Sequence, residues 1–72
     1  MGHWNYRVVR LETGQLAIEE VGYDDQGKPA NRCAPSLLDD NVDELRDTIA
    51  AVARALDEPI LELEAFAPTA QT

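Results

Sequence analysis

One apolar stripe constrains this fold more than any other feature of the sequence. Five aliphatic residues follow one another at steps of three, four, three and four positions, the period of a single helix face, and alanines between them favour helix. Asn41 is a good N-cap, and Pro59 disfavours helical backbone at the residue before it. The sequence therefore predicts one amphipathic helix that ends near Leu56 or Asp57, with a stripe made of Val42, Leu45, Ile49, Val52 and Leu56.

Strand-like segments lie on both sides of this helix. Residues 4–12 and 16–23 are rich in β-branched and aromatic side chains and are separated by a glycine turn. Residues 29–35 predict a short third strand at a sheet edge, because the two prolines there cannot donate hydrogen bonds. Residues 60–64 alternate apolar and acidic side chains, which predicts a fourth strand.

The order β-β-β-α-β predicts an α+β fold. We expect a small, mostly antiparallel sheet of three to four strands with one amphipathic helix packed on one face. We expect the 72 residues to form one domain, 1–72, with an ordered core at about 4–64 and a flexible tail at 65–72. The sheet face away from the helix would carry Val21 and Tyr23, and a second copy of the chain is the simplest cover for it.

Charge and composition exclude several classes of function. Fourteen acidic and six basic residues give a net charge of −8, which disfavours direct binding to nucleic acids or to anionic membranes. The lack of a long apolar stretch or a signal peptide predicts a cytoplasmic protein. One cysteine, Cys33, permits no disulfide within the chain, and one histidine with one cysteine cannot form a structural zinc site. We therefore expect neither metal nor cofactor.

Acidic residues crowd the start of the helix, at Asp39, Asp40, Asp43, Glu44 and Asp47. A calcium loop would need glycine and glutamate at positions that hold Glu44 and Ala50, so the spacing excludes that interpretation. Asn41 and Glu44 have the spacing of a capping box, and negative charge is favourable at this end of the helix dipole. Because one or two acids suffice for a cap, the excess leaves open a second hypothesis, imitation of nucleic-acid phosphates.

Catalytic groups are scarce. Ser36 is the only serine, and His3, the only histidine, lies in a segment expected to fray, so we predict no enzyme and no catalytic residues. Trp4, Tyr6 and Tyr23 are expected to form an aromatic patch that serves as core or as a dimer contact. Arg7 and Arg10 are expected to form cross-strand ion pairs with Glu19 and Glu20.

Three segments carry a resemblance to a family of small uncharacterised bacterial proteins: NYRVVR, LAIEEVGYDDQGKP and VDELRDTIAAVARALDEPILELE, at 5–10, 16–29 and 42–64. The chain is similar to that family's pattern, although Glu19 and Gly22 depart from it. The order of elements also resembles the partner-binding domain of HicB-type antitoxins, which implies an acidic domain that covers a basic RNA-cleaving toxin.

These features together predict a non-enzymatic acidic protein-interaction domain that forms a homodimer or serves as an accessory subunit for an unknown protein. The alternative is an acidic inhibitor, a nucleic-acid mimic or antitoxin-like protein, that binds a basic nucleic-acid-processing protein. The predicted contact residues are the aromatic and helix-start groups, namely Trp4, Tyr6, Val21, Tyr23, Asp39, Asp40, Asp43, Glu44 and Asp47.

Overall fold

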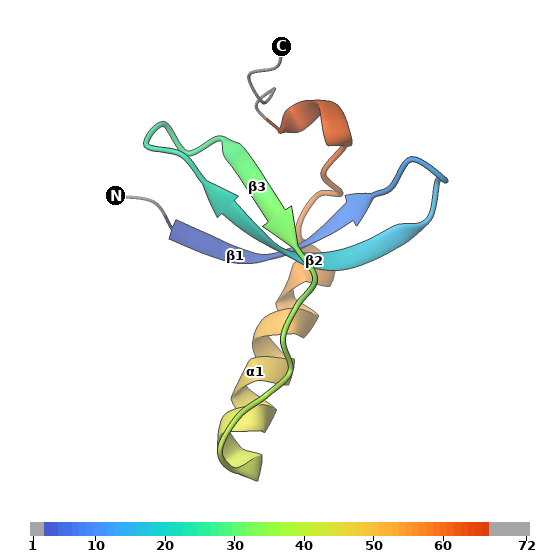
Figure 1. Ribbon diagram of the computed structural model, residues 1–72. Coiled ribbons are helices and arrows are strands. Elements are labelled where there is room, and N and C mark those ends of the chain that lie inside the picture. The colour runs from blue at the N-terminus through green and yellow to red at the C-terminus, as the bar shows by residue number, and fades with distance from the viewer. Residues whose placement is uncertain (1–2, 67–72) are drawn as a thin grey trace.

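Three strands and one α-helix make up the computed structural model, which describes residues 3–66 (Figure 1). The strands form one antiparallel sheet in the order β1-β2-β3, so the predicted α+β fold, the antiparallel sheet and the single helix are confirmed. The elements are β1 (His3–Arg10), β2 (Leu16–Tyr23), β3 (Pro29–Cys33), α1 (Val42–Arg54) and two 3₁₀ turns, η1 (Ala55–Asp57) and η2 (Leu63–Ala65).

Tight turns fix the register of the sheet. Gly14 joins β1 to β2 and Gly27 joins β2 to β3, with φ of 90° and 80°, backbone conformations that glycine adopts without strain. In the second turn the Asp24 carboxylate accepts hydrogen bonds from the backbone N–H groups of Gln26 and Lys28, both at 2.9 Å. A carboxylate that accepts hydrogen bonds from the backbone a few residues later is characteristic of an Asx turn.

Very few side chains form the core. Val9 and Val21 are fully buried, and Val8 and Ala55 are 7% and 1% exposed. The register of β1 and β2 places Val9 and Val21 on the same face of the sheet. The prediction that Val21 would meet a partner is therefore wrong, because this chain already buries it.

The helix reaches the sheet only through its C-terminal end. Figure 1 shows α1 projecting away from the sheet, and none of its residues is buried. Contact with β1 comes from the last turn of α1 and from η1, where Ala55 is buried. The coil between β3 and α1 runs beside the helix in Figure 1, and Thr48 Oγ1 donates a hydrogen bond to Asp39 Oδ2 across this contact at 2.8 Å.

The expected fourth strand at 60–64 is reduced to a single residue. Leu61 forms an isolated parallel bridge with Val9, donating its N–H to Val8 O at 2.9 Å and accepting from Arg10 N at 3.0 Å. Proline at position 59 has no N–H to extend this ladder, and the 3₁₀ turn η2 begins two residues after the bridge. Of the expected tail at 65–72, residues 67–72 lie outside the described residues.

Ion pairing on the sheet also differs from the expectation. Arg10 pairs with Glu62 at 3.2 Å, and Glu19 pairs with Arg32 of β3 at 2.7 Å. Arg7 faces Glu19 in the register but donates instead to Tyr23 Oη at 3.2 Å and to the carbonyl of Pro59 at 2.7 Å. Pro59 and Glu62 follow the helix and Arg32 lies in β3, so contacts from outside the first hairpin explain why the predicted ion pairs within it were wrong.

Two residues have environments that the sequence did not indicate. His3 belongs to β1, where its ring stacks on Tyr23 with centroids 4.9 Å apart, so it is not outside the folded segment. Cys33 is exposed at the end of β3 rather than packed, and its Sγ lies 4.0 Å from Glu20 Oε1.

The Asp24 turn makes folding stability depend on pH. Hydrogen bonds from the backbone N–H groups of Lys28 and Gln26 hold the pKa of the Asp24 carboxyl below its usual value of 3.8. A depressed folded-state pKa stabilises the fold above the unfolded pKa, and this contribution is lost as the pH falls through the folded pKa. We expect Asp24→Ala to melt at a lower temperature than the wild-type protein at pH 7. The difference in melting temperature should shrink below about pH 4.

Thermal unfolding followed by circular dichroism between pH 2 and 7 tests this expectation. Glu12→Ala is the matched control, because Glu12 lies in the other hairpin turn and makes no hydrogen bond within residues 3–66. A difference for Asp24→Ala that stays constant down to pH 2 would contradict the assigned role.

Candidate functional site

The helical stripe divides into an inner and an outer row. Leu45 and Val52 are half-buried on the side that faces the rest of the chain. Val42, Ile49 and Leu56 are exposed by 67%, 48% and 68%. These three residues lie seven apart, so they align along one side of the helix. We call them the α1 ridge.

Further apolar side chains are exposed near both ends of the helix. Leu37 and Leu38, in the coil before α1, are 52% and 84% exposed, and Ile60, just after η1, is 40% exposed. A set of large exposed aliphatic residues on one small domain is typical of a protein contact surface.

The acidic residues gather at the free end of the projecting helix. Asn41 Oδ1 accepts the N–H of Glu44 at 2.9 Å, which confirms the predicted N-cap. The Glu44 carboxylate accepts from the N–H of Asp40, at 3.3 Å, rather than from that of Asn41 as the predicted capping box requires. Asp43 pairs with Arg46 at 3.0 Å, and both side chains are largely exposed.

Helix capping and local ion pairing therefore explain part of this acidic cluster. Asp39 accepts a hydrogen bond from Thr48, while Asp40 and Asp47 are exposed at the same end of the helix. Within residues 3–66 there is no group of three or more His, Cys, Asp or Glu side chains arranged to hold a metal ion. Nor is any helix in this range long and apolar enough to cross a membrane.

The predicted aromatic patch is split between the two faces of the sheet. Trp4 and Tyr6 share one face and meet edge to face, with ring centroids 5.2 Å apart at 86°. Tyr23 lies on the opposite face, where its hydroxyl donates to Asn5 Oδ1 at 2.7 Å. Burial raises the pKa of the Tyr6 phenol above its usual value of 10.0, and the nearby carboxylates of Glu20 and Asp39 raise it further.

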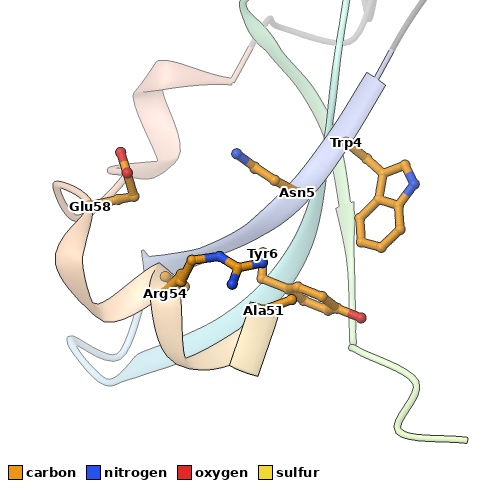
Figure 2. Close-up of a pocket in the computed structure, with 7 residues that line it drawn as sticks. Trp4, Asn5, Tyr6, Ala51, Arg54 and Glu58 are labelled. Carbon is orange, nitrogen blue, oxygen red and sulfur yellow. The ribbon is translucent and has the colours of Figure 1, made fainter. Parts of the chain in front are cut away.

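A half-open cleft of about 300 Å³ lies between the first half of β1 and the end of the helix (Figure 2). Aromatic and alanine side chains provide apolar surface, and Arg54 and Glu58 provide one charge of each sign. Its lining consists of Trp4, Asn5, Tyr6, Ala51, Arg54, Ala55 and Glu58.

Sequence reasoning identified the aromatic wall of this cleft and missed the helical wall. Arg54 forms no ion pair within the described part of the chain. Ala51 and Ala55 were interpreted only as helix-favouring residues. A possible signal was their four-residue spacing, since small residues so placed let a helix approach another element closely.

Comparison with known proteins identified no relative of this chain. The chain matches no family model, no curated protein and no solved structure.

The N-cap is the feature of the acidic end whose energetic contribution can be measured directly. We expect Asn41→Ala to destabilise the protein by about 1 kcal/mol, because the N–H of Glu44 loses its acceptor. Urea unfolding measures the change, and Asn41→Ser, which keeps a capping oxygen, is the control and should remain close to the wild-type value. Equal loss in both variants would show that the cap is not the stabilising feature.

Proposed function

We propose that this protein is a non-enzymatic acidic protein-interaction domain that works as a homodimer, with the α1 ridge as the self-association surface. The observation that carries the proposal is the exposure of Val42, Ile49 and Leu56 on a helix without a single buried residue. The apolar side of such a helix is removed from contact with water only when it packs against another surface.

The size of the core supports the same conclusion. Only four hydrophobic residues among the described ones are buried, Val8, Val9, Val21 and Ala55. Domains of this length bury a small share of their surface and often gain stability from association. A second copy placed on the ridge would add an apolar layer that no other element within residues 3–66 supplies.

The distribution of charge permits this pairing despite the net charge of −8. By the helical period, Ala53 and Arg46 flank the ridge, whereas Asp43, Glu44 and Asp47 lie around the helix from it. In an antiparallel pair related by twofold symmetry, Ile49 meets its own copy and Val42 meets Leu56 of the other chain, because the ridge positions are evenly spaced.

The acidic end supports a second candidate, the acidic inhibitor. Asp39, Asp40, Asp43, Glu44 and Asp47 are all exposed at the end of a helix that projects from the sheet, and among them only Asp43 has an ion pair. A projecting acidic end can enter the basic groove of a nucleic-acid-binding protein, as the resemblance to antitoxin domains also suggests.

Sedimentation velocity over a concentration series tests the dimer. We expect the wild-type protein to dimerise by high micromolar concentration, and Ile49→Glu to weaken dimerisation at least about tenfold, since a buried unpaired carboxylate is costly. Ala50→Glu adds the same charge to an exposed neighbour outside the ridge and should leave the dimer intact. A monomeric wild-type protein, or an unchanged Ile49→Glu dimer, contradicts the proposal.

Competition with DNA tests the inhibitor. If the domain mimics phosphates, it should displace proteins held on DNA–cellulose, and the effect should fall steeply with salt. Replacing Asp40, Asp43 and Asp47 by Asn should abolish displacement, while replacing Glu12, Asp57 and Glu64 by uncharged amides removes equal charge elsewhere and should not. Salt-insensitive displacement, or equal loss in both triple variants, contradicts this candidate.

A further inference from the structure

One edge of the sheet is open beside the cleft. The carbonyl of Val8 and the N–H of Arg10 point outward from β1, since both bond to Leu61. Outward-pointing backbone groups recur at every second residue of an antiparallel strand, so those of Tyr6 and Trp4 point to the same edge. Among the described residues, no element pairs with this edge before the Leu61 bridge.

Pro59 explains why the edge stays open. A parallel ladder extended backward from Leu61 would need the N–H of residue 59 to reach the carbonyl of Tyr6, and proline has no N–H. The carbonyl of Pro59, which such a ladder would also use, accepts the Arg7 guanidinium at 2.7 Å. The chain therefore blocks its own pairing at the point where the open edge begins.

The cleft is built on this edge. Three consecutive residues of β1, residues 4–6, line it, although neighbouring side chains of a strand point to opposite faces. A cleft that touches all three borders the edge of the strand rather than one face. Figure 2 draws the side chains of β1 that line the cleft together with Arg54 and Glu58, which come from the end of the helix and from the segment after it.

Two properties of the cleft indicate what would fill it. Trp4 is 57% exposed and stands beside Tyr6, and together with Ala51 and Ala55 it offers apolar surface for a large side chain. The Arg54 guanidinium makes no hydrogen bond or ion pair within residues 3–66. A carboxylate is the group that a free guanidinium binds best, through two parallel hydrogen bonds.

We propose that the open edge at Trp4 and Tyr6 binds an extended segment of another protein, which adds a strand to the sheet. The main chain of the segment bonds to the outward groups of β1, a large apolar side chain fills the cleft, and an acidic side chain pairs with Arg54. The binding site presupposes that the domain works through protein contacts, but it does not use the α1 ridge.

Selection from a displayed library of random heptapeptides tests the site. The wild-type domain should enrich peptides in which a large apolar residue stands next to Asp or Glu. Trp4 is the only tryptophan, so its fluorescence reports binding of a synthetic copy of the selected peptide directly. We expect Arg54→Glu to weaken binding of that peptide at least tenfold. A peptide with Lys in place of the acidic residue should recover binding to this variant.

Matched variants separate this result from misfolding and from loss of the dimer. Lys28→Glu makes the same charge change in the turn between β2 and β3, away from α1 and from the open edge, and should bind the selected peptide as the wild-type protein does. Arg54→Gln should weaken binding without reversing its charge preference, and all three variants should sediment like the wild-type protein. Methylation of the peptide backbone nitrogens should abolish binding, because strand addition needs those N–H groups.

Three results would overturn the proposal. They are a selection that enriches nothing, an Arg54→Glu variant that binds the selected peptide as well as the wild-type domain does, and backbone-methylated peptides that still bind. Pairing of β1 with β1 of a second copy would overturn it as well, and would appear as concentration-dependent change in Trp4 fluorescence in the Ile49→Glu variant.

Discussion

The attachment of the helix to β1 is the contact on which the rest of the molecule depends. Ala55 is buried there, and six residues later Leu61 forms hydrogen bonds to both Val8 and Arg10. This short connection holds only the end of the helix, so α1 projects from the sheet instead of lying across it (Figure 1). The exposed ridge, the acidic free end and the cleft beside β1 all follow from that one point of attachment.

A small core and large exposed apolar residues occur together in the described part of the chain. The four hydrophobic residues buried within residues 3–66 leave the outer row of the helix without a covering layer. These exposed residues are the surface on which the proposed association depends.

Local sequence patterns predicted the helix and most of the strands. Contacts between residues distant in sequence determine which residues come together at the candidate sites. Asn41 and Gly14 act through their immediate neighbours, so the helix start and the turn between β1 and β2 could be predicted. The alternation at 60–64 predicted a strand, but Pro59 and its contact with Arg7 limit pairing to Leu61. The prediction of one aromatic patch was wrong because Tyr23 lies on the sheet face opposite to Trp4. Only the register of the strands determines this placement.

By itself the sequence determined the α+β order, the helix boundaries, the turns and the excess of acidic charge, because propensity, capping and composition act over a few residues. The tertiary structure decided which apolar residues are buried and which are exposed. Val21 became core, Val42 and Leu56 stayed at the surface, and Arg54 came to face a strand about fifty residues away. Burial depends on the position of the helix relative to the sheet, and no periodicity within one segment encodes that position.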